Sequence, residues 1–156
     1  MESRNGPGVR FPPPALFVAG FLVGLLAHRV APLSIGPPYS PGRDIAGVLL
    51  VVAGLAWVVW GLWTFHRAGT PIMPIAPATR VVTWGPYRFS RNPMYVGLGV
   101  TYFGLALMFN VLWSLLVLPL VYVALVAFVV GREENHLREA FGNEYADYCS
   151  RTRRWF

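Results

Sequence analysis

The stretch IAGVLLVVAGLAWVVWGLWTF, residues 45–65, contains no charged side chain. A helix of this length rises about 30 Å, which is the thickness of the hydrocarbon core of a bilayer. Trp57, Trp60 and Trp63 lie towards its C-terminal end, as is typical of a helix that ends at a membrane interface. The stretch therefore predicts a membrane-spanning helix.

The composition of the whole chain agrees with a membrane protein. Its 156 residues are 55% hydrophobic and 13% charged, and the mean hydropathy is +0.49. Soluble domains have about 25% charged residues, so an ordinary water-soluble globule and a disordered chain are both excluded. The single cysteine, Cys149, excludes an internal disulfide. His28, His66 and His136 lack metal-ligand spacing, so no metal site is expected.

Three more spans are predicted from the remaining apolar runs. Residues 1–14 are rich in proline and glycine and predict an irregular tail, followed by a first span over residues 15–30. The uncharged run from Pro93 to Gly131 is too long for one span, and Asn110 is its only strongly polar residue. We divide it there into helices 93–109 and 111–131. The expected fold is all-α, with four membrane helices, the last two forming a hairpin, in one domain over residues 15–156.

The arginines predict the orientation in the membrane. All 13 basic residues are arginines. In a four-span arrangement, eleven of them lie on the side of the two termini and the 66–92 connector. The positive-inside rule then places both termini in the cytoplasm, and a bacterial inner membrane is the expected location. Because the arginines flank apolar runs, they suit anionic lipid headgroups better than nucleic acid, which is not an expected partner.

The tail over residues 132–156 differs from the spans because it contains five acidic residues and five arginines. Leu137, Phe141, Tyr145 and Tyr148 recur at spacings of four, four and three, which places them on one face of a helix. This pattern predicts an amphipathic helix on the cytoplasmic membrane surface, which Gly142 could divide in two.

Two segments could support chemistry. Thr83 to Gly97 reads TWGPYRFSRNPMYVG, in which Asn92 is a good N-cap and Pro93 a good first helical residue. With Arg88 and Arg91 beside it, this helix start could bind an anion, although the residues alone favour a merely well-capped helix. The pair Glu133-Glu134 could hold a cation or ribose hydroxyls. It could equally pair with Arg138 one turn later, and the two interpretations stay open.

These segments resemble a known family. Gly85-Pro86-Tyr87-Arg88, then Arg91-Asn92-Pro93-Met94-Tyr95-Val96-Gly97, is similar to the GPY-R…RHP-x-Y-x-G signature of the isoprenylcysteine carboxyl methyltransferase family. The tail from Glu133 to Tyr148, followed by Arg153-Arg154-Trp155, resembles the EE-xx-L-xxx-FG-xx-Y-xx-Y ending of that family. The membrane phospholipid methyltransferases belong to the same superfamily. The resemblance covers roughly residues 45–156, and Asn92 replaces the histidine of the family.

The resemblance implies S-adenosylmethionine as the methyl donor and a lipid-like or small apolar methyl acceptor. It implies catalytic roles for Arg91 and Glu134. The cofactor-binding residues that it implies are Tyr87, Arg88, Asn92, Tyr95, Gly97, Glu133, Glu134, Leu137, Phe141, Tyr145 and Tyr148, with Gly54 as the nearest match to a family G-x-G. The simpler interpretation of Gly54 is helix packing.

Two other functions stay open at this point. Sterol reductases that use NADPH look similar in their C-terminal half, but they need more spans and a site for a 2′-phosphate. A non-catalytic membrane subunit is the third interpretation. The acceptor could be a prenylcysteine carboxylate, a phospholipid amine, or a small thiol or phenol.

Overall fold

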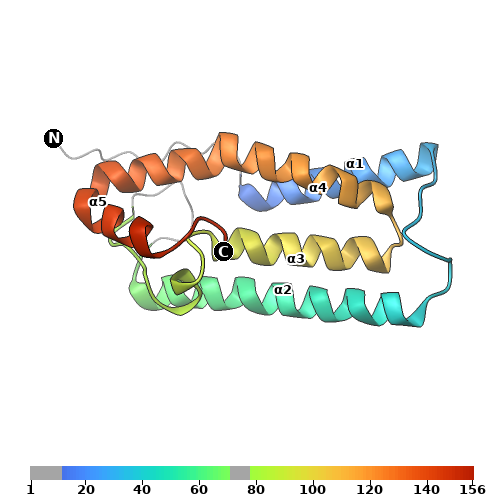
Figure 1. Ribbon diagram of the computed structural model, residues 1–156, viewed down its shortest axis with the longest axis horizontal. Helices are drawn as coiled ribbons and strands as arrows, with labels where there is room; N and C mark the ends of the chain where they lie inside the picture. The colour runs from blue at the N-terminus through green and yellow to red at the C-terminus, as the bar shows by residue number, and fades with distance from the viewer. Residues whose placement is uncertain (1–11, 71–77) are drawn as a thin grey trace.

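The computed structural model describes residues 12–70 and 78–156, and its regular elements are all helical. Long helices run side by side along one axis (Figure 1). They are α1 (Pro13–Val30), α2 (Pro41–Ala68), α3 (Pro93–Met108) and a continuous helix made of α4 (Leu112–Leu125), the π-helical turn η2 (Val126–Val130) and α5 (Gly131–Arg151). A short 3-10 turn, η1 (Gly85–Arg88), precedes α3.

The outer surface of this bundle is apolar. Among the described residues, α1, α2 and the helix Leu112–Arg151 are long and apolar enough to cross a membrane, and α3 is a shorter apolar helix. Large apolar side chains point outward from them, among them Leu22, Val52, Leu120 and Val123. A water-soluble bundle would bury such side chains, whereas a bilayer covers them. The predicted all-α membrane fold is therefore confirmed.

The first helix begins at Pro13, two residues before the predicted start. Proline is tolerated in the first turn of a helix because its missing N–H would have no partner there and its φ is already helical. Residues 1–11 of the predicted irregular tail lie outside the described part of the chain.

Glycines bring α2 and α3 into backbone contact. Gly54 faces Gly97, where a Cβ atom would lie 2.8 Å from the Gly54 carbonyl oxygen. At Gly104 a Cβ atom would lie 2.7 Å from the Gly47 carbonyl oxygen and 2.8 Å from the Val51 nitrogen. Helices in a bilayer associate through such close packing, since lipid tails are as apolar as the side chains. Gly54 and Gly97, both predicted to bind a cofactor, thus lie in this helix contact.

The hairpin between α3 and α4 turns at Asn110, where the sequence predicted it. Asn110 has a φ of 56°, a left-handed conformation that asparagine tolerates better than most residues. Its side-chain oxygen accepts hydrogen bonds from the Ile35 and Gly36 nitrogens, and its amide donates to the Gly36 carbonyl. One side chain therefore joins the turn to the loop between α1 and α2.

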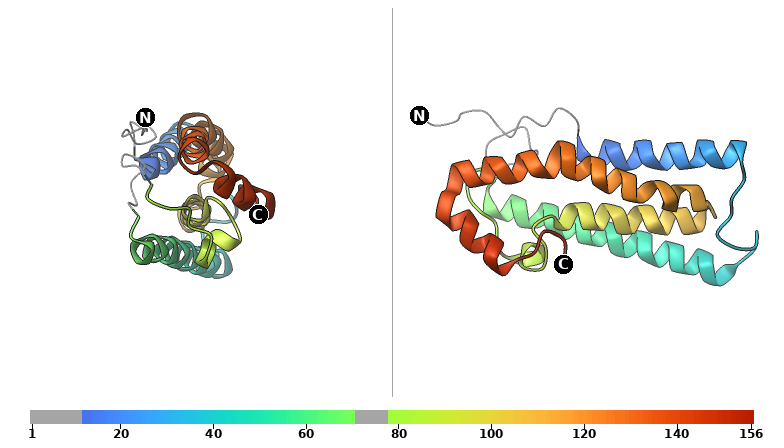
Figure 2. Two further views of the ribbon diagram at one scale, coloured as in Figure 1. Left: turned by 90° about the vertical axis from the view of Figure 1, so that its left-hand side faces the viewer. Right: turned by 45° about the horizontal axis from the view of Figure 1, so that its top comes forward.

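The last span and the tail form one helix, in contrast to the predicted boundary at residue 131. Gly131 has helical dihedral angles, and the chain continues through η2 into α5. The direction changes instead at Gly142, whose φ of 49° and ψ of −119° are not helical. Beyond that kink the chain turns back, so that the C-terminus lies beside the start of α3 (Figures 1 and 2). The fold thus places the tail against the first turn of α3.

We expect Gly104→Ala to destabilise the bundle by about 1–3 kcal/mol, the usual effect of overpacking, because its new methyl group meets α2 backbone atoms. Gly36→Ala is the matched control, since nothing lies within 4 Å of a Cβ atom there. The melting temperatures of both variants are measured by thermal unfolding in detergent, and the reaction of Cys149 with a thiol dye reports the unfolding. Equal melting temperatures for the two variants would contradict this account of the α2–α3 contact.

Candidate functional site

A tight turn places Tyr87 against the end of α2. Gly85 has a φ of 63°, and a Cβ atom there would lie 2.7 Å from the Thr64 hydroxyl oxygen, so this position favours glycine. The turn buries Tyr87, whose ring centroid lies 4.9 Å from that of Phe65. The Tyr87 hydroxyl is buried and has no hydrogen-bond partner among residues 12–70 and 78–156. A tyrosine hydroxyl without a partner is therefore held near the start of α3.

The three residues just before α3, Ser90 to Asn92, bind the C-terminal residues. The backbone N–H of Arg91 donates to the Arg153 carbonyl at 3.0 Å. The Ser90 hydroxyl and the Asn92 side-chain amide donate to the Arg154 carbonyl, at 3.0 and 3.2 Å. Asn92 occupies the N-cap position but makes no side-chain cap hydrogen bond, which corrects the predicted capping role. Its amide holds the tail instead.

Glu134 lies at the centre of an arginine cluster. Arg154 binds it with two hydrogen bonds, Nε to Oε1 at 3.0 Å and Nη2 to Oε2 at 2.7 Å. Arg91 lies 3.2 Å and the predicted partner Arg138 3.4 Å from its carboxylate. Burial alone would raise the pKa of Glu134, but the hydrogen bond from Arg154 and the three positive charges outweigh it and lower that pKa. Glu134 is therefore a charged group that arginines already neutralise.

Glu133, the adjacent residue, has different surroundings. The Tyr95 hydroxyl donates to its Oε1 atom at 2.7 Å. Among residues 12–70 and 78–156, no arginine or histidine forms an ion pair with it. Burial raises the pKa of Glu133 to about 6, an effect that the Tyr95 hydrogen bond opposes and the charge of Glu134 increases. Glu133 thus offers a negative charge that a cationic ligand could balance.

Two tyrosines from α5 complete the cluster. Tyr145 and Tyr148 are buried with ring centroids 6.2 Å apart, and the Tyr148 hydroxyl donates to the Tyr87 carbonyl at 2.7 Å. Burial raises the pKa of Tyr87, Tyr145 and Tyr148 above that of an ordinary phenol. All three hydroxyls therefore stay protonated at neutral pH and keep their donor hydrogens.

The structure brings together most, but not all, of the predicted site residues. Arg91, Tyr95, Glu133 and Glu134 are joined by the contacts above, and Tyr87 by Tyr148. Arg88 is exposed, with its guanidinium 4.9 Å from the Phe89 ring centroid. Leu137 and Phe141 are half-buried on α5 before the kink, and Gly54 and Gly97 lie in the α2–α3 contact.

Two residues near the cluster were not among the predicted site residues. Arg154 binds Glu134 across 20 positions of sequence, whereas the helix spacing rule pointed only to Arg138. His136 is buried, and its Nε2 atom has no hydrogen-bond partner in the part of the chain that the structure describes. The Arg153-Arg154-Trp155 ending was the available signal for the first. For His136 the sequence offered only its position two residues after Glu134.

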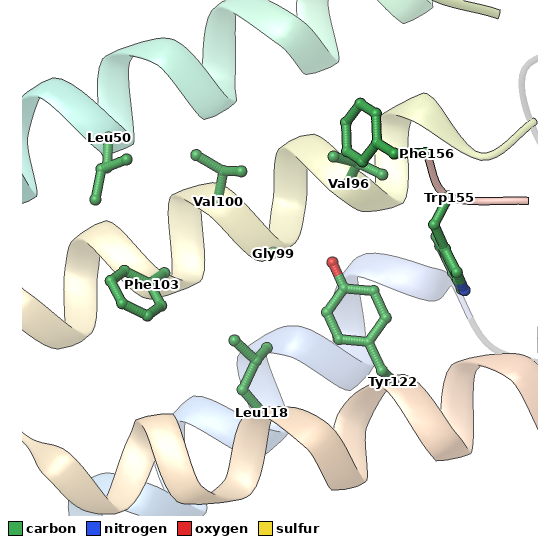
Figure 3. A pocket seen from close by; sticks show the side chains of 9 residues that line it. All are labelled: Leu50, Val96, Gly99, Val100, Phe103, Leu118, Tyr122, Trp155 and Phe156. Carbon is green, nitrogen blue, oxygen red and sulfur yellow. The ribbon is translucent and has the colours of Figure 1, made fainter. Parts of the chain in front are cut away.

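An apolar groove adjoins the cluster on the membrane side. It has a volume of about 550 Å³. Figure 3 shows its lining from α2, α3, α4 and the C-terminus: Leu50, Val96, Gly99, Val100, Phe103, Leu118, Tyr122, Trp155 and Phe156. The Tyr122 hydroxyl donates to the Tyr95 carbonyl at 3.1 Å, so the groove meets the cluster at Tyr95. The volume and the apolar lining of this groove suit a small apolar molecule or a hydrocarbon chain.

No metal centre is found among the described residues: none of the His, Cys, Asp and Glu side chains in 12–70 and 78–156 form a group that could hold an ion.

We expect Glu134→Gln to release the C-terminal residues, because Arg91 and Arg154 would lose their shared negative partner. Hydrogen bonds to charged groups contribute about 1.5–3 kcal/mol, and a loss of this size should appear in thermal unfolding and as faster carboxypeptidase cleavage. Glu139→Gln is the control, an exposed carboxylate on the same helix. Resistance to cleavage equal to that of the control would show that Glu134 does not hold the tail.

One of three comparisons with known proteins found a match. The model of the phospholipid methyltransferase family matches residues 43–144, which include α2, α3, α4 and most of α5. No curated protein and no solved structure matches the chain. The match covers well over half of the sequence and includes Glu133, Glu134 and the first turn of α3. The chain therefore belongs to the phospholipid methyltransferase family, a family of membrane methyltransferases.

Proposed function

We propose that this membrane methyltransferase uses S-adenosylmethionine to methylate a lipid-like acceptor. The observation that supports this most strongly is the meeting of the two motif segments at one end of the bundle. Tyr95 binds Glu133, Arg91 binds Glu134 and Tyr148 binds the Tyr87 carbonyl. Segments about 40 residues apart in sequence thus form one polar cluster at the edge of the apolar region.

The polar atoms of the cluster fit such a cofactor. Three buried polar atoms, the Tyr87 hydroxyl, Arg91 Nε and His136 Nε2, have no hydrogen-bond partner among the described residues. Buried polar groups are normally paired. S-adenosylmethionine has a carboxylate, ribose hydroxyls and adenine nitrogens that could satisfy them. Arg91 suits the carboxylate better than Arg88, which is exposed beside Phe89.

The positive charge of the cofactor fits Glu133. This carboxylate has no cationic partner among the described residues, and aromatic ring faces such as that of Tyr95 attract cations as well. Leu137 and Phe141, half-buried on α5, could cover the adenine. We assign Glu134 a positioning role, since its contacts hold Arg91 and the C-terminal residues.

When bound, S-adenosylmethionine would supply a methyl group on its sulfonium, which would pass in line to the acceptor as the methyl–sulfur bond breaks and S-adenosylhomocysteine leaves. The protein's own residues align the two reactants, exclude water and balance charge. Arg91 and Asn92 orient the polar end from the start of α3, and Glu133 stabilises positive charge at the reacting centre. We assign no residue a covalent role in this reaction.

The acceptor would reach the site from the bilayer. The groove beside Val96 and Val100 is lined by apolar side chains, and its outer wall includes the exposed Phe103. We place the apolar part of the acceptor there, with its reactive group near Tyr95. The cofactor would arrive from the aqueous side, at the other end of the same cluster.

The arginine distribution supports a cytoplasmic site. The start of α3 and the C-terminal residues lie at the same end of the bundle (Figure 1), and they include Arg88, Arg91, Arg153 and Arg154. By the positive-inside rule this end faces the cytoplasm, where S-adenosylmethionine is made. A bacterial inner membrane is the location that we propose.

Isothermal calorimetry on the detergent-solubilised protein tests the choice of cofactor. We expect binding of S-adenosylmethionine and of S-adenosylhomocysteine, and no binding of NADPH, because the cluster offers a free carboxylate for a sulfonium. Binding of NADPH alone would support the reductase alternative instead. Binding of neither would favour a non-catalytic subunit.

The pH dependence of cofactor binding tests Glu133. Its pKa of about 6 predicts that affinity for S-adenosylmethionine rises between pH 5 and 7, as the carboxylate ionises and can balance the sulfonium. Glu133→Gln should abolish this rise and weaken binding at pH 7 by roughly tenfold to a hundredfold, the equivalent of one charge-assisted hydrogen bond. Glu139→Gln should behave as the wild type.

Thermal unfolding gives an independent readout of the same group. The folded-state pKa of Glu133 is raised from 4.5 to about 6, so its contribution to stability is present below pH 4.5 and is lost as the pH rises through 6. Glu133→Gln should therefore gain stability relative to the wild type between pH 4.5 and 7. A constant difference over this range would contradict the raised pKa.

A further inference from the structure

The five residues after α5, Thr152–Phe156, form a C-terminal strap that is fixed at several points. The Arg153 and Arg154 carbonyls accept hydrogen bonds from Ser90, Arg91 and Asn92, which immediately precede α3. The Arg154 guanidinium binds Glu134. A chain terminus is usually poorly ordered unless it is tied down, and here polar contacts hold the two residues that precede Trp155.

These contacts determine where Trp155 lies. Its ring stands edge-on to Tyr122, with centroids 5.3 Å apart and an interplanar angle of 86°. The Tyr122 hydroxyl in turn donates to the Tyr95 carbonyl. Trp155 is therefore packed between α4 and the start of α3, at the end of the groove that adjoins the polar cluster (Figure 3).

The groove extends from this point along α3 into the apolar part of the bundle. Val96, Val100 and Phe103 follow one another at spacings of four and three and line its length, about 10 Å at 1.5 Å per residue. Tyr122 is the only lining residue with a side-chain hydroxyl, and that hydroxyl is already bonded. The groove thus offers hydrocarbon contacts along its length. Trp155 lies at the end of the groove that adjoins the polar cluster, where the reactive group of an acceptor would lie.

A hydrocarbon chain of a bilayer amphiphile is the occupant that these observations favour. The surrounding outer side chains are apolar and exposed, among them Phe103 and Leu120, so lipid chains are the neighbours of the opening. The described lining side chains are hydrocarbon apart from the bonded Tyr122 hydroxyl and the Trp155 indole N–H, so the groove suits an apolar chain better than a polar ligand. Its one polar boundary is the Tyr95–Glu133 end, where the headgroup of an amphiphile would lie.

We propose that Trp155 is a specificity-determining residue, which limits the bulk of the acceptor next to its reactive group and so selects a single-chain over a two-chain amphiphile. This inference rests on the proposed function. The indole ring packs against Tyr122 at the end of the groove and takes up space there that a second chain would need. On the α4 side the groove cannot widen beneath Tyr122, because the Tyr122 hydroxyl already contacts Gly99.

The test compares two lipids that have the same headgroup but different numbers of acyl chains. One lipid is lysophosphatidylethanolamine and the other is phosphatidylethanolamine, and each has a photoreactive diazirine near the end of an acyl chain. We add each lipid to the full-length protein in nanodiscs and map the labelled residues by mass spectrometry. We expect the one-chain lipid to label Val100, Phe103 and Leu118 at least tenfold more than the two-chain lipid does. Labelling of Val52 and Val123, which face outward elsewhere, should be equal for both lipids.

Trp155→Ala should remove this preference and let the two-chain lipid label the groove, whereas Trp63→Ala, an exposed tryptophan on α2, should keep it. Trp155→Phe retains a ring against Tyr122, so it should give an intermediate ratio of one-chain to two-chain labelling. It replaces the alanine variant in the test if that variant does not fold. Equal labelling of the groove by both lipids in the wild type, or an unchanged ratio in both Trp155 variants, would overturn the proposal.

Cofactor binding separates this inference from the function on which it rests. S-adenosylmethionine affinity should stay within twofold of wild type in Trp155→Ala, because the change lies on the acceptor side. Loss of the lipid preference with normal cofactor binding supports the inference. A wild-type protein that shows the preference but binds no S-adenosylmethionine would refute the proposed function and leave the lipid selectivity standing as a separate property.

Discussion

The ion-pair cluster at Glu134 is the interaction on which the rest of the site depends. The Glu134 carboxylate accepts two hydrogen bonds from Arg154 and forms an ion pair with Arg91, and its side chain is only 4% exposed. Burying a carboxylate is costly unless such partners replace its water. Once they do, the C-terminal residues, α5 and the first turn of α3 become one unit, and both the cofactor cluster and the end of the groove take their shape from it.

Adjacent carboxylates serve different purposes because successive residues on a helix point about 100° apart. Glu134 faces the arginines, and Glu133 faces the Tyr95 hydroxyl. The first is therefore neutralised within the protein. The second keeps a charge that a ligand can use, and its pKa is raised by burial and by the neighbouring charge of Glu134. A charge that destabilises the isolated protein can stabilise its complex with a cation.

The sequence predicted what depends on local patterns and missed what depends on long-range contacts. Uncharged runs located the helices, and one polar residue, Asn110, located the hairpin turn, because bilayer thickness and backbone geometry leave few alternatives. The spacing rule found Arg138 but not Arg154, since no local pattern links residues 20 positions apart. The π-helical turn at Val126–Val130 has no composition signal, so the continuity of the last span with the tail was not predicted.

The central claim is that the two motif segments together bind S-adenosylmethionine. Ultraviolet cross-linking of the radiolabelled cofactor to the full-length protein tests it most directly, and mass spectrometry identifies the labelled peptides. The account predicts label in two peptides, one containing Tyr87 to Tyr95 and one containing Glu133 to Tyr148, because contacts between these segments form the cluster. Label confined to the loop between α1 and α2, at the opposite end of the bundle, would contradict it, as would the absence of any specific label.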